Sequence, residues 1–229
     1  MSEVIRGVFS DTHIPFAHPN YLQFLKDTFA EWGVQEIICL GDLVDNHAIS
    51  RFNSEPCADG AYTELDKARS QIKELTDAFP EVKMCRGNHD DIVFRQASTL
   101  GLGSVFIKPF REIYGLPKGW DIQDEFVLDG VLYTHGTGRS GKNATLNMAI
   151  QERMSLCMGH THCFGGVDYI ANNRETIFGL NTGCLIDTTG KSYAFEYAKF
   201  NKQRPTLGCG IVVDKHEAYF IPMNGKYIE

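Results

Sequence analysis

The sequence lacks an apolar run that approaches the ~18 residues of a membrane-spanning helix, and no basic segment followed by a long apolar stretch stands near its start. We therefore expect a cytoplasmic protein without a membrane segment. None of the seven cysteines form a Cys-x-x-Cys pair, and several lie in apolar runs such as residues 37–40. This pattern is typical of buried, reduced thiols.

Basic residues are not in excess, since the formal net charge is −7. That charge, and the lack of stripes of basic and aromatic side chains, argue against a long nucleic-acid track. Internal repeats and low-complexity tracts are also missing. The 229 residues, 43% hydrophobic and 22% charged, suit a single globular domain spanning residues 1–229.

The first half of the chain alternates predicted strands and helices. Short apolar runs at residues 4–9, 36–40 and 82–85 predict strands. Apolar residues at helical spacing predict helices over residues 21–32 and 63–79. This alternation indicates an α/β protein with a parallel sheet.

The second half is richer in strands. Residues 125–128 and 131–134 flank Asp129-Gly130, a favourable hairpin turn. A helix is predicted over residues 144–153, followed by a strand over residues 155–158.

Residues 167–171 and 175–179 predict a further hairpin. A strand at residues 193–198 and a hairpin formed by residues 210–213 and 218–221 are expected to complete a second sheet. Loop-like insertions are predicted over residues 46–60 and 100–118, where selectivity for substrate often lies.

Five short segments place potential metal ligands beside a glycine or another ligand, mostly where a predicted strand ends. They are Asp11-Thr12-His13, Gly41-Asp42-Leu43-Val44-Asp45, Gly87-Asn88-His89-Asp90, His135-Gly136 and Gly159-His160-Thr161-His162. Open α/β sheets bind ligands at the carboxyl ends of their strands. Oxygen and imidazole donors in this number suit two divalent cations.

Side-chain direction supports this interpretation. In an extended segment, residues i and i+2 project to the same side, so we expect Asp11 and His13 to approach one ion together. The same geometry is expected to let His160 and His162 converge. Asp42 has two carboxylate oxygens and can bridge two ions.

The ordered series Asp-x-His, Gly-Asp-x-x-Asp, Gly-Asn-His-Asp, His and Gly-His-x-His resembles the calcineurin-like metallophosphoesterases. The resemblance implies an α/β fold, a four-layer α/β/β/α sandwich of two mixed sheets flanked by helices. It also implies two divalent metal ions, with manganese expected and iron, zinc or nickel as alternatives. By this resemblance, one metal is held by Asp11, His13, Asp42 and His162, and the other by Asp42, Asn88, His135 and His160.

The resemblance also implies a mechanism, in which a metal-bridging hydroxide attacks phosphorus in line. His89 is expected to protonate the leaving oxygen as a general acid. Asp45, three residues after Asp42, is the expected partner that holds His89 in position and keeps it charged.

The motifs divide between branches of this family. Arg86 before Gly87-Asn88-His89 resembles the protein-phosphatase branch, where an arginine here contacts phosphate with its guanidinium fork. Asn46 follows Asp45 where that branch has Arg-Gly. Gly-His-Thr-His is typical of the nuclease and nucleotide-diesterase branches.

Residues 136–143 nearly match a phosphate-binding Walker A loop, but Asn143 replaces the required Ser or Thr. A nucleoside triphosphatase is therefore disfavoured. We expect the backbone N–H groups of this loop, with Arg139 and Lys142, to bind the rest of the substrate.

The sequence therefore predicts a metal-dependent hydrolase of phosphomonoesters or phosphodiesters, of phosphodiesterase/nuclease type or a general phosphatase. Its expected substrate is a nucleotide, a short nucleic acid, or a phosphorylated small molecule or protein. A phosphoprotein phosphatase and a non-catalytic protein-binding scaffold on the same fold are the alternatives. The presence of His89 and Asp45 together with every implied ligand favours the enzyme.

Overall fold

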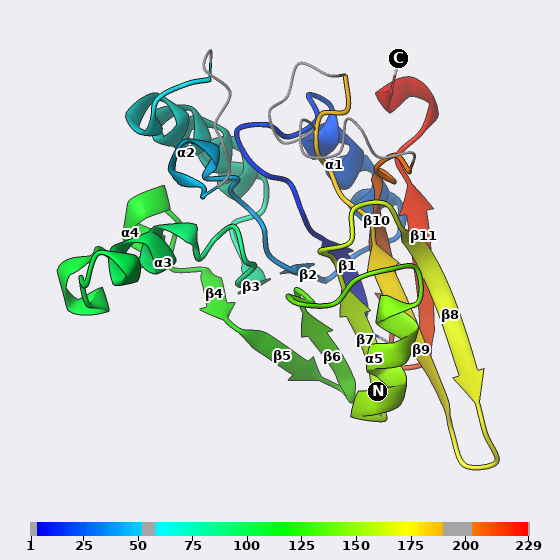
Figure 1. Ribbon diagram of the computed structural model, residues 1–229. Helices are drawn as coiled ribbons and strands as arrows, with labels where there is room; N and C mark the ends of the chain where they lie inside the picture. Colours follow the sequence, from blue (N-terminus) through cyan, green and yellow to red (C-terminus); the bar gives the residue numbers. More distant parts are fainter. Residues whose placement is uncertain (1–3, 52–57, 190–202, 229) are drawn as a thin grey trace.

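The computed structural model describes residues 4–51, 58–189 and 203–228, and its strands form two sheets (Figure 1). The first sheet contains β1 (Ile5–Phe9), β2 (Glu36–Cys39), β3 (Val82–Cys85), β4 (Trp120–Gln123), β10 (Gly208–Val213) and β11 (Glu217–Pro222). The second contains β5 (Glu125–Leu128), β6 (Val131–Thr134), β7 (Ser155–Met158), β8 (Gly165–Ala171) and β9 (Thr176–Thr182).

Helices cover the outer faces and form the insertions. They are α1 (Tyr21–Glu31), α2 (Ala61–Ala78), α3 (Ile92–Thr99), α4 (Phe110–Tyr114) and α5 (Ala144–Glu152), with 3₁₀ turns η1 (His47–Ile49), η2 (Ser104–Phe106) and η3 (Gly225–Tyr227). In Figure 1, α1 and α2 lie above the first sheet and α5 lies beside β7 and β9.

Both sheets are mixed. The first has the order β11-β10-β1-β2-β3-β4, in which β1 to β4 pair parallel and β10 pairs antiparallel with β1 and β11. The second has the order β5-β6-β7-β9-β8, with β6, β7 and β9 parallel and antiparallel strands at both edges. Within each sheet, the carboxyl ends of the parallel strands therefore share one edge.

Alternating side chains divide the core of the first sheet between its two faces. Phe9 and Cys39 join the core beneath α1 and α2. Their neighbours Val8 and Ile38 face the second sheet, where they pack with Tyr133 and other residues of its inner face.

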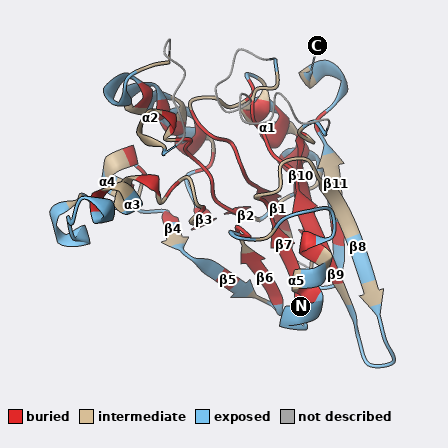
Figure 2. Ribbon diagram, in the orientation of Figure 1, coloured by how far each residue is buried: buried red, intermediate tan, exposed pale blue. Residues whose placement is uncertain are grey.

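The outer face of the second sheet packs against α5, where Leu156 and Met158 meet Ala144 and Ala149. The strand β7, buried at every position, lies between that helix and the first sheet (Figure 2). The predicted α/β/β/α sandwich of two mixed sheets is thus confirmed.

The helix α1 illustrates how the apolar pattern sets the packing. Phe24, Leu25 and Phe29 are buried at helical spacing, so one face of the helix lies in the core. Asn20 precedes the helix, but its side chain does not cap it. Instead, its Nδ2 donates to the main-chain oxygen of Tyr227 at 2.9 Å.

The last hairpin differs from the prediction. Strands β10 and β11 join the first sheet, because β10 pairs with β1 from Ile5↔Val213 to Val8↔Gly210 and so covers an otherwise open edge. The predicted strand at residues 193–198 lies outside the described residues. The expected loop over residues 100–118 contains α4 and η2, and β4 follows it.

No helix within the described ranges is both long and apolar enough to span a membrane. In the same ranges the cysteines are free thiols, buried except for the half-buried Cys163. Burial raises the pKa of the Cys39, Cys157 and Cys184 thiols well above the usual value. These cysteines therefore act as small apolar core residues.

Candidate metal centre

The predicted donors converge where the two sheets meet at the carboxyl ends of their strands. Asp11 and His13 follow β1, Asp42 follows β2, Asn88 follows β3, His135 follows β6, and His160 and His162 follow β7. The centre therefore combines donors from both sheets, and its geometry depends on how the sheets pack.

The first group of donors contains Asp11, His13, Asp42 and His162, whose candidate ligand atoms all lie within 4.8 Å of one another. Nε2 of His162 is 3.0 Å from Oδ1 of Asp11 and 3.1 Å from Nε2 of His13. This group brings together the four residues of the first implied ligand set.

The second group contains Asp42, His135 and His160. Nε2 of His135 lies 3.1 Å from Oδ2 of Asp42, 3.2 Å from Nδ1 of His160 and 3.1 Å from Oδ1 of Asn88. The four residues of the second implied set are thus also together. Asp42 belongs to both groups, the position that a bridging carboxylate requires.

Backbone conformation, not strand alternation, aims several of these side chains. Asp11, His13, Asp42 and His160 have φ of 51°, 48°, 49° and 68°, in the left-handed region that residues other than glycine seldom adopt. The expectation of an extended segment at Asp11 and His13 is therefore wrong, although the two side chains do converge. Such conformations cost of order 1–3 kcal/mol each and cluster at functional sites.

Glycines allow neighbouring loops to approach the two carboxylates. A Cβ on Gly87 would collide with the Asp42 side chain, and one on Gly159 would collide with Asp11 and Ser10. The bare backbone leaves room for the main-chain N–H groups of His89 and His160, which donate to Asp42 Oδ1 at 2.7 Å and to Asp11 Oδ2 at 2.9 Å.

The sequence analysis assigned no role to Asp90, which is fully buried. Its carboxylate accepts the main-chain N–H groups of Asp42, Val44 and Gly87 at 2.8–3.2 Å. Asp90 therefore ties the loop after β2 to the loop after β3. Its position as the fourth residue of Gly-Asn-His-Asp was the available signal.

In His13 and His135, the ring nitrogen that points away from the centre is hydrogen-bonded to an oxygen of the protein. Nδ1 of His13 lies 2.6 Å from Oδ1 of Asp45, and Nδ1 of His135 lies 3.0 Å from the main-chain oxygen of Leu40. With these oxygens as acceptors, Nδ1 carries the proton and Nε2 faces the centre. This arrangement typically orients a histidine that binds a metal.

His89 stands beside this group, with its ring centroid 4.5 Å from that of His13. Its Nδ1 donates to the main-chain oxygen of Asp45 at 2.7 Å, while the Asp45 carboxylate is 3.4 Å away. Asp45 therefore does lie beside His89, but the shorter contact comes from its backbone. The carboxylate of Asp45 is committed to His13.

Carboxylates and imidazoles in the cluster shift each other's pKa values. Burial alone would raise the pKa of Asp11, but hydrogen bonds from His13 and His162 outweigh it and lower that pKa well below its usual value. Burial disfavours charge on His135, yet the adjacent Asp42 raises the pKa of His135 to about 9. The pKa of His13 is also raised well above its usual value, so without metal His13 and His135 hold protons that a bound cation would displace.

The donor set fits two divalent cations. Neighbouring ligands of one ion, with bonds of about 2.1 Å, lie about 3.0–3.4 Å apart, and the closest contacts above fall at 3.0–3.2 Å. Facing imidazole nitrogens such as those of His13 and His162 share at most one proton. A divalent cation between them would satisfy both lone pairs.

The predicted substrate-binding residues lie outside this cluster. The Arg86 guanidinium pairs with Asp91 at 3.3 Å and Asp124 at 3.1 Å, and neither carboxylate belongs to the donor groups. Arg139 is half-buried in the loop between β6 and α5. Lys142 is exposed and lines a separate cavity of about 250 Å³.

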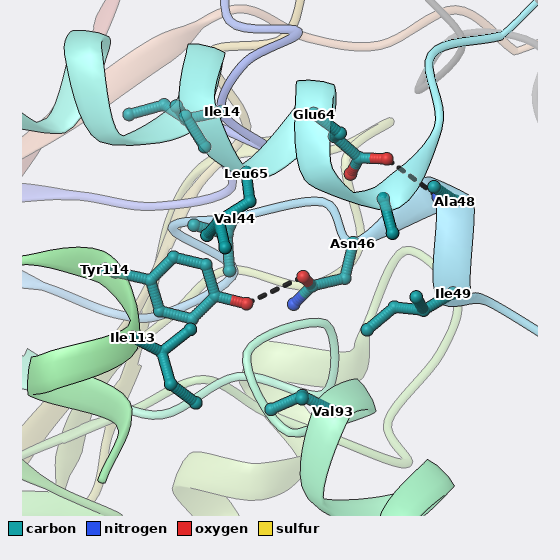
Figure 3. A pocket seen from close by; sticks show the side chains of 12 residues that line it. Ile14, Val44, Asn46, Ala48, Ile49, Glu64, Leu65, Val93, Ile113 and Tyr114 are labelled. Atoms are coloured by element: carbon teal, nitrogen blue, oxygen red, sulfur yellow. Dashed lines mark hydrogen bonds between the residues drawn. The ribbon is translucent and has the colours of Figure 1, made fainter. Parts of the chain in front are cut away.

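Behind the centre lies an apolar cavity of about 210 Å³, shown in Figure 3. Asn46 stands between this cavity and the centre, since its Nδ2 donates to the His89 main-chain oxygen at 3.0 Å and its Oδ1 accepts from Tyr114 at 2.7 Å. Glu64 accepts the N–H groups of His47 and Ala48. Burial raises the pKa of Glu64 to about 7.

A family comparison agrees with this geometry. The sequence model described as calcineurin-like phosphoesterase matches residues 7–164, more than half of the 229 residues. No curated protein matches the chain.

Several solved structures match the chain at low sequence identity. Vacuolar Protein Sorting 29 from Cryptosporidium parvum is 13% identical, with a TM-score of 0.50 and 97% of this chain and 92% of that chain covered. Yfce, a phosphoesterase from E. coli, is 17% identical, with a TM-score of 0.42 and coverage of 91% and 87%. Pseudomonas putida nuclease MPE is 17% identical, with a TM-score of 0.40 and coverage of 94% and 87%. At 13% identity, the first likeness concerns the fold alone.

Proposed function

Because the chain belongs to the calcineurin-like phosphoesterase family, we propose that it hydrolyses phosphate esters at a centre of two divalent cations. The observation that carries this proposal is the pair of donor groups that share Asp42. Two cations side by side are an established device for phosphoryl-oxygen chemistry.

The proposed ligands are those of the two groups. One cation would be held by Asp11, His13, Asp42 and His162, and the other by Asp42, Asn88, His135 and His160. When bound, such ions polarise phosphoryl oxygens and acidify water. We propose manganese as the resident metal.

We propose His89 as the general acid that protonates the leaving oxygen. Its Nδ1 donates to the main-chain oxygen of Asp45, and we assign delivery of the proton to Nε2. Asp45 acts as a positioning residue for both His89 and His13, through its backbone and its carboxylate respectively. A positioned acid contributes about 10²–10⁴-fold in rate.

Arg139 and Lys142 are proposed to bind the part of the substrate that does not react. Arg86 is proposed to reach phosphate only if a substrate draws it from its ion pairs with Asp91 and Asp124. The proposed substrate is a phosphomonoester or phosphodiester of a nucleotide, a short nucleic acid, or a phosphorylated small molecule or protein.

The test measures hydrolysis of p-nitrophenyl phosphate and bis-p-nitrophenyl phosphate by manganese-loaded protein, before and after chelation. We expect turnover of at least one ester, its loss with chelator, and its return when manganese is restored. His89→Asn, purified in parallel, excludes a contaminating hydrolase if its rate falls with the metal content unchanged.

The scaffold alternative predicts a different result. Two bound metals without turnover of either ester, or of a panel of cyclic nucleotides, dinucleotides, DNA, RNA and a phosphopeptide, would support a protein-binding scaffold. The panel also separates monoesterase from diesterase activity.

A further inference from the structure

A second cavity, of about 270 Å³, opens directly beside the donor cluster. Asn88 and His89 form its inner wall, Ser50 and Arg51 after η1 form one side, and the first turns of α3 form the other. Since Asn88 Oδ1 contacts His135 and the His89 ring contacts His13, a molecule in this cavity would lie against the centre.

Two arginines line this cavity, Arg51 from the chain after η1 and Arg95 from α3. The Arg95 guanidinium donates to the main-chain oxygen of Asn88 at 2.6 Å, and that of Arg51 donates to Thr99 Oγ1 at 3.3 Å. Among the described residues, no carboxylate forms an ion pair with either arginine, whereas Arg86 pairs with two. Counting only partners in the described part of the chain, each guanidinium uses one of its five donors, and the others are available to a ligand.

The walls of the cavity are held in place by further contacts. Gln96 donates to the main-chain oxygen of Ile49 at 2.7 Å and so ties α3 to η1. Ile92 is buried at the base of the helix. The spacing of the two arginines is thus set by packed elements of the fold.

His89 defines which part of a substrate this cavity can take. A general acid must lie next to the oxygen that leaves phosphorus, and His89 is part of the cavity wall. The group attached to the leaving oxygen therefore extends past His89 into the cavity, towards Arg51 and Arg95.

We propose that this cavity binds the leaving group and selects one that carries a phosphate of its own, held by Arg51 and Arg95. This inference rests on the proposed function, with His89 as the acid. In the reaction, the bond between phosphorus and the leaving oxygen breaks and water supplies a hydroxyl group to phosphorus. The leaving oxygen takes the proton of His89, which the remaining proton of the water replaces.

The test compares phenyl phosphate with 1,4-phenylene bisphosphate, whose leaving group differs chiefly by a phosphate. We expect wild-type protein to favour the bisphosphate in kcat/KM by at least about tenfold, the effect of a ~1.4 kcal/mol interaction. Arg95→Ala and Arg51→Ala should each lower this ratio, and the double variant should bring it to about 2, the statistical value for two equivalent phosphates.

Controls separate selection from damage to the centre. Arg174→Ala removes an equally exposed arginine from the β8–β9 turn, far from the cavity, and should leave the ratio unchanged. Manganese content is measured in every variant, because Arg95 also contacts the loop of Asn88. Arg95→Lys keeps the charge and should retain part of the preference.

Several outcomes would overturn the inference. A wild-type ratio near 2, or a ratio that stays high in the double variant, removes these arginines from leaving-group binding. If wild-type protein hydrolyses neither of these monoesters, calorimetry with the same two compounds decides the inference alone, and the assays with p-nitrophenyl phosphate and bis-p-nitrophenyl phosphate decide the proposed function separately. Binding of the bisphosphate that is tighter than that of phenyl phosphate in wild type, but equal in the double variant, supports the cavity; equal binding in wild type contradicts it.

Discussion

The donor cluster and the arginine-lined cavity meet at Asn88 and His89, but their side chains are held in different ways. In the cluster, Asp11, His13, Asp42 and His135 are each exposed by 2% or less. Several of them are locked by left-handed backbone or by a second-nitrogen hydrogen bond. In the cavity, Arg51 and Arg95 are exposed, and each guanidinium makes one hydrogen bond to residues in the ranges that the structure describes.

This difference teaches which part of the site can vary. Moving a buried donor disturbs both sheets and the loops between them, so the chemistry is built into the core of the fold. Replacing an exposed arginine disturbs little else, because substitutions on the surface, away from the core and from buried polar networks, usually change the free energy of unfolding by about 0.5 kcal/mol or less. We therefore expect substitutions of the buried donors to lower metal binding or stability. Substitutions of the exposed residues around the centre, which we call the rim, should change substrate selectivity.

The largest effect is expected for Asp42→Asn. The side chain loses its charge at the position common to both donor groups, so both cations should bind weakly. Because each ion contributes several kcal/mol to stabilising charge in the transition state, kcat/KM should fall by about 10³-fold or more. Metal analysis by mass spectrometry should show substoichiometric manganese; a full complement of two ions would contradict the bridging role.

His89→Ala tests the residue that lines the cavity and contacts His13 of the donor cluster. The expected loss is about 10²–10⁴-fold in kcat, with both cations retained, because neither donor group that contains Asp42 includes His89. Steady-state kinetics and metal analysis on one preparation distinguish this result from loss of the centre. Loss of manganese in this variant would instead make His89 a ligand.

Asp90→Asn changes a buried residue that is not itself a proposed metal ligand. The amide retains one acceptor oxygen but places an NH₂ group towards the N–H donors of Asp42, Val44 or Gly87. An unsatisfied buried donor costs about 1–3 kcal/mol, and about 1 kcal/mol shifts Tm by about 2–4 °C in a chain of this size. We expect calorimetry of the metal-free protein to show a Tm lowered by several degrees.

The smallest effect is expected on the rim, for Arg139→Ala combined with Lys142→Ala. Arg139 is half-buried and Lys142 is exposed, so metal content and Tm should be unchanged. KM for phosphate esters should rise several-fold, more than kcat falls, because uniform binding is lost. An unchanged KM would remove this loop from the substrate site.

The motifs predicted the membership of the cluster well, because each donor stands at the end of a strand that the apolar pattern reveals. Asp42 after residues 36–40 and His135 after residues 131–134 are examples. The means of convergence could not be predicted. Left-handed φ at Asp11 and His13 depends on the loops that pack around them, and no local pattern encodes it.

The sequence analysis also did not identify residues that contact the centre from distant positions in the chain. Asp90 acts on the loop after β2, 46–48 residues away. Arg95 reaches the centre only because α3 begins directly after the Asn88 loop, in a region without a predicted helix. The final hairpin was assigned to the wrong sheet, since pairing of β10 with β1 joins residues about 200 positions apart.

The amino-acid sequence by itself determined the alternation of strands and helices over residues 4–85, the two-sheet α/β class and the residues that converge at the centre. These depend on short-range periodicity and on residues adjacent to strand ends. Only the tertiary structure decided that the carboxylate of Asp45 contacts His13, and that Arg51 and Arg95 stand beside His89 while Arg86 pairs with Asp91 and Asp124. Those facts follow from the packing of the two sheets and their loops, where contacts between distant residues select one arrangement among several that local preferences allow.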